Sequence, residues 1–129
     1  MLIKTNHLRA IGKRRVSGEW RVASGERIQH AIAKAKKIRP RKFVEIEVCN
    51  FQEFKAALMA RPDAILQDNW SISKIKKAVV FRNSSLLEVS GGVTLANVRA
   101  IARTGVDRIS VGRLTHSAPA LDVSLEAVR

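Results

Sequence analysis

The sequence predicts an α/β protein, a partial parallel βα barrel of about five strands with alternating helices. Two observations predict this class. Short apolar runs recur at intervals of about 20 residues, and segments with helical periodicity separate the later runs. Alternation of strand and helix is typical of βα units, whose strands lie parallel. We expect residues 1–129 to form a single domain, which is long enough to bury a core.

The predicted strands are the short apolar runs. They cover residues 2–4, 43–48, 64–68, 86–90 and 108–112. The second run alternates, so its apolar side chains fall on one face of the strand while Glu45 and Glu47 fall on the other. If that other face is a barrel interior, two carboxylates there are costly unless a cation or a ligand meets them. The alternative is an edge strand whose glutamates face solvent.

Helical periodicity predicts helices over residues 28–37, 52–60, 72–80 and 95–103. Ser71 is the expected N-cap of the third helix and Thr94 that of the fourth, with Gly105 just past the fourth helix's end. The residues at about 13–26 contain two glycine corners and no sustained period. This pattern predicts a basic irregular insertion.

The net charge of +13 is concentrated near the N-terminus. Between Arg9 and Lys42 there are twelve Lys or Arg residues and only two acidic residues. Such a cluster attracts polyanions, including nucleic acids, acidic protein surfaces and phosphorylated small molecules. A solvated basic face is the alternative. The sequence has few aromatic residues and no Tyr, so it offers no evident stacking platform for single-stranded nucleic acid.

Composition also bounds the cellular setting. No apolar stretch approaches the roughly 18 residues of a membrane span, and the N-terminus lacks the apolar core of a signal peptide. We therefore expect a cytoplasmic protein with no membrane partner. Cys49, the single cysteine, cannot form an internal disulfide. Because it follows an apolar strand, we expect it to be a small buried hydrophobic residue.

Polar residues stand at the carboxyl ends of the predicted strands, where ligands bind in parallel βα folds. The candidate site residues are Lys4, Glu47, Asp68, Ser90, Gly91, Gly92, Gly112 and His116. Some have ordinary alternatives: Lys4 as a solvated cation, Asp68 as a helix cap and His116 as a surface histidine. Because Ser71 is the better-placed cap, Asp68 is left for a site. The convergence of these groups at strand ends is stronger evidence than any one residue.

The double-glycine turn, residues 90–92, is the most informative of these segments. It follows a strand and precedes a predicted helix, so its N–H groups and the positive end of that helix suit a phosphate group. A second glycine turn, at Gly112, follows the next strand. Phosphate sites in βα barrels commonly use the last two strand loops in this way.

Five segments of the sequence resemble a known family. LIKTNH, VEIEV, ILQDN, EVSGGVTLANV and TGVDRISVGRLTHSAPALDVSL resemble the carboxyl-terminal part of quinolinate phosphoribosyltransferase, also called carboxylating nicotinate-nucleotide pyrophosphorylase. The resemblance covers nearly all of the chain outside about residues 13–26. The order and spacing of the motifs make it specific, and the closing motif is the most distinctive.

That family makes nicotinate mononucleotide, pyrophosphate and carbon dioxide from quinolinate and phosphoribosyl pyrophosphate, with magnesium, in NAD biosynthesis. The resemblance implies that Lys4 contacts the substrates. It implies that Glu47 and Asp68 face the ribose and its Mg²⁺, where carboxylates stabilise a positively charged centre as pyrophosphate leaves. The double-glycine turn and Gly112 would hold the 5′-phosphate, with His116 nearby.

The sequence also departs from the family. Thr5 stands where the family usually has Asp, Gln67 where it has an apolar residue, and Arg113 where it has a small one. The family's amino-terminal sandwich domain and earlier barrel strands, which grip quinolinate's carboxylates, have no counterpart in the sequence. The barrel is therefore expected to be incomplete relative to the family's. Because the family works as dimers, the resemblance implies a homo-oligomer.

The resemblance thus implies a phosphoribosyltransferase of NAD biosynthesis in a truncated form, with phosphoribosyl pyrophosphate and quinolinate as substrates. Mg²⁺ is the cofactor that the resemblance implies. The alternative is a non-catalytic remnant whose basic segment binds nucleic acid or an acidic partner.

Overall fold

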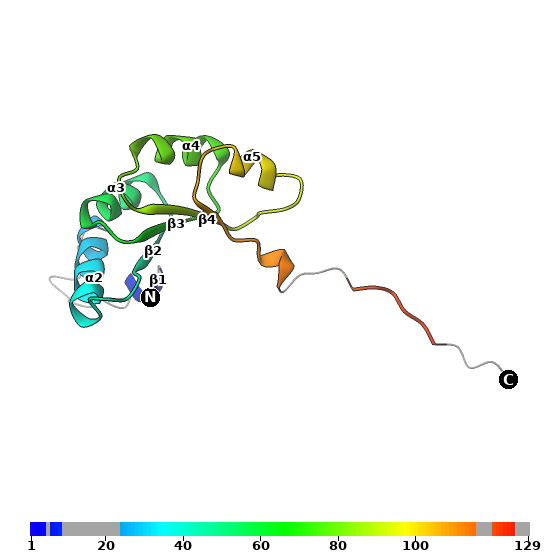
Figure 1. Cartoon of the computed structure of the whole chain (residues 1–129), viewed down its shortest axis with the longest axis horizontal. Coiled ribbons are helices and arrows are strands. Elements are labelled where there is room, and N and C mark those ends of the chain that lie inside the picture. Colours follow the sequence, from blue (N-terminus) through cyan, green and yellow to red (C-terminus); the bar gives the residue numbers. More distant parts are fainter. Residues whose placement is uncertain (5, 9–23, 116–119, 126–129) are drawn as a thin grey trace, which may run out of the picture.

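The computed structural model describes residues 1–4, 6–8, 24–115 and 120–125. Its strands form one parallel sheet with helices packed on it. The strands are β1 (Leu2–Ile3), β2 (Glu45–Val48), β3 (Ala64–Asp68), β4 (Leu86–Ser90) and β5 (Arg108–Ile109), and they lie in that order. Each is parallel to the next. Within the described residues the sheet does not close, and β1 and β5 form its edges (Figure 1). The predicted α/β class with five parallel strands is confirmed.

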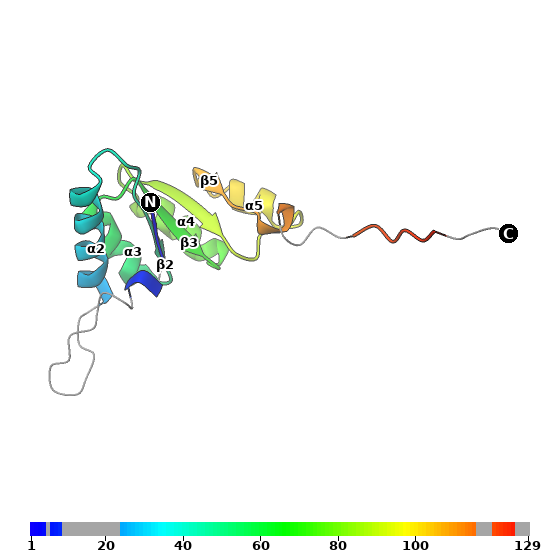
Figure 2. The same cartoon turned by 90° about the horizontal axis from the view of Figure 1, so that it is seen from below.

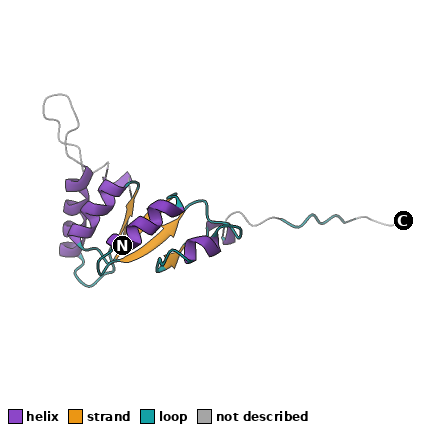
Figure 3. Ribbon diagram, turned by 90° about the horizontal axis from the view of Figure 1, so that it is seen from above, coloured by secondary structure: helices purple, strands orange, loops and turns teal. Residues whose placement is uncertain are grey.

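The helices lie between the strands along the chain. They are α2 (Ser24–Ile38), α3 (Phe51–Ala60), α4 (Ile72–Phe81) and α5 (Val98–Ala102), followed by the short 3₁₀ helix η1 (Gly112–Leu114). Helices α2 and α3 pack side by side (Figure 3), and α3, α4 and α5 lie on the same face of the sheet (Figure 1). We call this covered face the outer face and the opposite face the inner face. Residues 120–125 run away from the sheet (Figure 2).

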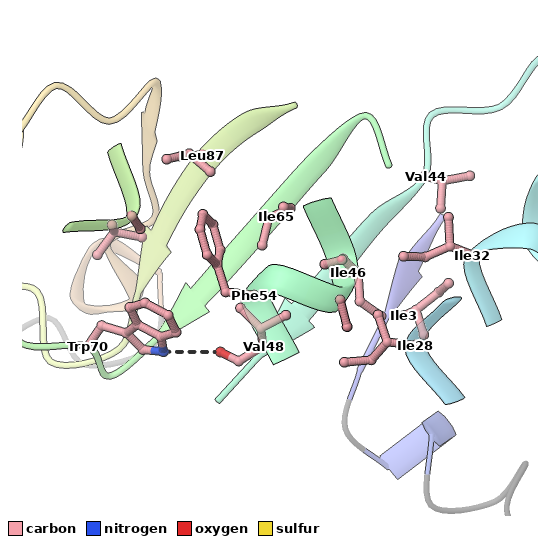
Figure 4. Close-up of a cluster of buried hydrophobic side chains, with 14 of the residues drawn as sticks. Ile3, Ile28, Ile32, Val44, Ile46, Val48, Phe54, Ile65, Trp70 and Leu87 are labelled. Atoms are coloured by element: carbon pink, nitrogen blue, oxygen red, sulfur yellow. Dashed lines mark hydrogen bonds between the residues drawn. The ribbon is translucent and has the colours of Figure 1, made fainter. Parts of the chain in front are cut away.

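The core lies between the outer face and the helices (Figure 4). Ile46, Ile65 and Leu87 occupy matching positions on β2, β3 and β4, and all three are fully buried. Phe54 of α3 packs against them with Trp70, whose indole N–H donates to the carbonyl oxygen of Val48 at 3.2 Å. This packing fixes which side chains of each strand lie on the outer face, toward the helices.

The alternation predicted for the second strand is confirmed. Ile46 and Val48 are fully buried on the outer face, whereas Glu45 and Glu47 are half-buried. Side chains two residues apart share a face, so both glutamates lie on the inner face. They are not on an edge strand, because β2 pairs with β1 and β3.

Gln67 breaks the apolar pattern of the core. It pairs in register with Val48 and Val89, so it faces the helices, and its side chain is fully buried. Neither its amide oxygen nor its amide nitrogen has a hydrogen-bond partner in the described part of the chain. A buried amide without partners costs free energy, so this position destabilises the fold.

The fourth predicted helix is shorter than expected. It begins at Val98 with Asn97 at its N-cap, so the predicted start at residue 95 and the Thr94 cap are wrong. The Asn97 side chain accepts from the N–H of Thr94 at 2.8 Å and donates to the carbonyl oxygen of Gly92 at 2.9 Å. These two bonds stabilise a loop over residues 92–97 in place of a helical turn.

Three further expectations concern single segments. Cys49 is exposed, so its prediction as a buried residue is wrong; it follows β2 in the turn before α3. Of the expected insertion at about 13–26, residues 24–26 form the first turn of α2, and residues 13–23 lie outside the described residues. No helix in the described ranges is long and apolar enough to cross a membrane.

Candidate active site

Strand register brings polar side chains together on the inner face. Glu47 pairs with Leu66, Leu66 with Glu88, and Glu88 with Arg108, so these residues form one row across the sheet. One step toward the carboxyl ends, Asp68 pairs with Ser90. Lys4 is exposed just after β1, and the register of Ile3 with Ile46 places it at the level of Glu47.

Asp68 is held from two sides. The hydroxyl of Ser90 donates to Oδ1 of Asp68 at 3.0 Å, and the Asn69 amide donates to Oδ2 at 3.0 Å. Asn69 itself has φ +56° and its N–H donates to the carbonyl oxygen of Ser90 at 2.9 Å. Because both carboxylate oxygens have donors, the side chain is fixed at the junction between β3 and the double-glycine turn.

The double-glycine turn requires glycine for both conformation and space. Gly91 has φ +78° and Gly92 has φ +60°, in the left-handed region that side chains disfavour. A Cβ on Gly91 would lie 2.4 Å from Oδ1 of Asn69. Among the described residues, no group accepts a hydrogen bond from the N–H of Gly91, Gly92 or Val93. The turn therefore presents free main-chain donors.

A cavity of about 380 Å³ lies between this turn and the loop after β5. Its wall includes Ser90, Gly91, Gly92, Thr94, Gly112 and Arg113. The structure thus brings together four of the candidate residues from two loops. His116 lies outside the described residues. Because α5 begins only at Val98 and has five residues, the helix dipole contributes less here than the sequence suggested.

Glu88 and Ser110 extend this network and were not among the candidates. Ser110 donates its hydroxyl proton to Oε1 of Glu88 at 2.6 Å, and the Arg108 guanidinium lies 4.0 Å from Oε2. The signal that could have found Glu88 is the alternation of LLEVS, which places it on the same face as Ser90. Asn69 and Arg113 were not assigned to the site from the sequence, because their positions there depend on loop geometry.

Glu45 lies half-buried on the inner face, beside Glu88. Burial raises the pKa of its carboxyl, and the neighbouring Glu88 carboxylate raises it further. Arg108 and the N-terminal amino group act in the opposite direction. Its Oε1 atom is buried without a partner in the described part of the chain. The surroundings of Glu45 on the inner face therefore make its charged form less favourable than that of a fully solvated carboxyl.

The acidic residues of the inner face offer Mg²⁺ few protein ligands. The described ranges contain no group of three or more His, Cys, Asp or Glu residues that could hold a metal. Mg²⁺ often keeps several waters and takes only one or two carboxylates along with substrate phosphates. Glu47 and Asp68, half-buried on neighbouring strands, match that limited protein contribution.

The family model described as "Quinolinate phosphoribosyl transferase, C-terminal domain" matches residues 1–126. A probable carboxylating nicotinate-nucleotide pyrophosphorylase of Methanocaldococcus jannaschii is 33% identical, over 100% of this chain and 44% of its own length. The nicotinate-nucleotide pyrophosphorylase of Mycobacterium leprae is 34% identical, over 97% of this chain and 40% of its own length.

Solved structures are also similar to this chain. The crystal structure of the nicotinate-nucleotide pyrophosphorylase of Ehrlichia chaffeensis has a TM-score of 0.74 and 41% identity. The match covers 91% of this chain and 38% of that one. The chain therefore spans about two fifths of the length of the relatives that it matches.

Proposed function

Since this chain belongs to the quinolinate phosphoribosyltransferase family, in the region of its C-terminal domain, we propose that it binds phosphoribosyl pyrophosphate for transfer of the phosphoribosyl group to quinolinate. The products are nicotinate mononucleotide, pyrophosphate and carbon dioxide, in NAD biosynthesis. The groups that grip quinolinate's carboxylates belong to parts of the family's enzymes that precede the matched region. The residues of this chain supply the side that holds the phosphoribosyl donor.

The observation that carries this proposal is the meeting of two kinds of group at adjacent strand ends. Asp68, fixed by Ser90 and Asn69, lies beside a glycine-walled cavity with free N–H groups. A phosphoribosyl donor needs both kinds: donors for its 5′-phosphate, and carboxylates near the carbon that becomes positively charged.

The chemistry assigned to the chain is binding and electrostatic stabilisation. The N–H groups of the double-glycine turn hold the 5′-phosphate and orient the ribose. When the bond from the anomeric carbon to pyrophosphate oxygen breaks, the electron pair leaves with pyrophosphate, and positive charge develops on the ribose. The carboxylates of Glu47 and Asp68 stabilise that charge, and Lys4 attracts the anionic substrates. The ring nitrogen of quinolinate then forms the new bond to the anomeric carbon. One carboxylate of quinolinate leaves as carbon dioxide, and a proton takes its place on the ring.

Magnesium enters this proposal only as a bound counter-ion. Glu47 and Asp68 are the residues that would hold it, and when bound it neutralises charge on the departing pyrophosphate.

Titration calorimetry with phosphoribosyl pyrophosphate and MgCl₂ tests the proposal. We expect saturable binding that Asp68→Asn weakens about tenfold, because the variant loses the negative charge and its NH₂ group must face either Ser90 or Asn69, both of which donate to Asp68. Asp122→Asn is the matched control, since it makes the same change on the exposed segment 120–125. Absence of binding by the unaltered chain would contradict the proposed function.

We also propose that the protein works as a homo-oligomer. Support comes from the family resemblance and from large apolar side chains that the helices leave exposed, such as Met59 on α3 and Val80 and Phe81 on α4. Light scattering at micromolar concentration should detect a dimer or larger species. A purely monomeric solution would contradict this part of the proposal.

A second candidate function, binding of nucleic acid, is favoured by the basic end of α2. Lys36, Arg41 and Lys42 line a cavity of about 550 Å³ at the amino ends of the strands, and Asp63 is the one acidic residue among its described lining residues. Replacing Arg41 and Lys42 by Gln should weaken salt-dependent binding in a gel-shift assay. A shift that these changes leave unaltered would remove this candidate.

A further inference from the structure

The two serine hydroxyl groups at the cavity wall already donate to carboxylates. Ser90 donates its proton to Asp68 at 3.0 Å, and Ser110 donates its proton to Glu88 at 2.6 Å. Both serines line the cavity. A hydroxyl has a single proton to donate, so in this arrangement each serine presents only lone pairs to an incoming anion.

The same bonds place negative charge behind the wall. Asp68 and Glu88 each lie one hydroxyl group away from the cavity, and only Glu88 has a described cation near it, Arg108 at 4.0 Å. Their field opposes the entry of a phosphate group. Main-chain N–H groups supply partial charges and direction, but they add no net charge to offset two carboxylates.

Among the described residues that line this cavity, Arg113 is the one that carries a charge. It lies in η1, whose turn is closed by bonds from the N–H of Leu114 to Val111 O at 3.2 Å and from the N–H of Thr115 to Gly112 O at 2.9 Å. Its side chain is exposed and has no hydrogen bond or ion pair with any described residue. The guanidinium group offers five donors and a charge that is always present.

We infer that Arg113 is the counter-charge of the cavity and makes it selective for a doubly charged phosphate monoester. The inference rests on the proposed function, which places a 5′-phosphate in this cavity. The glycine N–H groups set where the phosphate oxygens lie, and Arg113 supplies the net charge that the carboxylates behind Ser90 and Ser110 demand. Arg113 is thus a specificity-determining residue for the donor's phosphate end.

Ribose 5-phosphate in metal-free buffer is the probe, because it carries the phosphate monoester without pyrophosphate or magnesium. Calorimetry should detect its binding, with unphosphorylated ribose as the negative control. Arg113→Ala should weaken the affinity about tenfold, as expected for loss of a charged hydrogen bond at an exposed site. Arg113→Lys should keep the affinity within about threefold, since a cation remains. Added salt should reduce the difference in affinity for ribose 5-phosphate between Arg113→Ala and the unaltered protein.

Arg39→Ala is the matched control. Arg39 is exposed just after α2, near the amino ends of the strands. The substitution therefore removes an equal charge far from the cavity. Its affinity should equal that of the unaltered protein. Equal affinity in Arg113→Ala would overturn the inference while leaving the proposed function standing. Failure of the unaltered protein to bind ribose 5-phosphate would overturn both, provided that its circular dichroism melting curve shows a folded protein.

Discussion

Substitution of Gly91 by Ala tests the link between the double-glycine turn and Asp68. The new methyl group would lie 2.4 Å from Oδ1 and 2.7 Å from Nδ2 of Asn69, so the Asn69 side chain must rotate away. The rotation itself is inexpensive, because the atoms displaced are the end of a flexible side chain. It breaks the bond from Asn69 to Asp68, which measures 3.0 Å.

Two terms add up to the expected loss of stability. Alanine at φ +78° costs roughly 1–2 kcal/mol in backbone strain. Loss of the partly exposed hydrogen bond to Asp68 costs about 1 kcal/mol more. Gly105→Ala is the matched control: its φ is +89°, but its added methyl group meets only Val79 Cγ1, at 3.5 Å. It therefore carries the strain term alone.

Urea unfolding gives the stability difference, and calorimetry with phosphoribosyl pyrophosphate gives the functional one. We expect Gly91→Ala to be about 1 kcal/mol less stable than Gly105→Ala and to lose most of its binding, whereas Gly105→Ala should bind normally. The reasoning would be refuted if the two variants had equal stability and both bound as the unaltered chain does. That result would mean that Asn69 does not connect the turn to Asp68.

Two further predictions concern buried polar groups. Gln67→Leu should stabilise the fold by about 1–3 kcal/mol in urea unfolding, because it removes a fully buried amide whose two polar atoms have no described partner; an unchanged or lower midpoint would contradict this. Glu45→Gln should stabilise the protein at pH 7. The raised pKa of Glu45 means that ionisation costs stability as the pH rises above its ordinary value of 4.5, whereas below that value both states are neutral. A stability gain that persists unchanged at pH 4 would show that the effect is not ionisation.

The sequence predicts the strands and most helices because their signals are local and periodic. The alternation of residues 43–48 identifies both faces of β2, and the stripe of Ile28, Ala31 and Ile32 identifies the buried side of α2. The start of α5 could not be predicted in this way. Asn97 can cap a helix or bridge a loop, and the bond to Gly92 that decides between them exists only once the loop has folded.

The candidate site, like the fold, has features that the sequence predicts and features that depend on the folded chain. Its residues follow from one rule, that parallel strands gather their carboxyl ends, and this rule identifies Asp68, Ser90 and the glycine turns. The partners of each side chain depend on register across strands. Sequence reasoning treated Ser90 as a phosphate ligand, whereas in the folded chain its hydroxyl proton is directed to Asp68. Glu88 lies in the same row as Glu47 only because β3 fixes the spacing between them.

Side-chain hydrogen bonds between neighbouring strands determine which groups of the inner face are left to bind a ligand. The serine hydroxyl groups donate to Asp68 and Glu88 and so orient these carboxylates, while no described group accepts from the N–H of Gly91, Gly92 or Val93. Acceptors for a positive centre and donors for a phosphate group therefore lie within a few residues of each other without neutralising one another. A phosphoribosyl donor has that same polarity, with a phosphate at one end and a developing cation at the other. A simple polyanion such as nucleic acid has no positive centre, so it would gain nothing from the carboxylates of Glu47 and Asp68, and this asymmetry favours the transferase function over the basic-surface alternative.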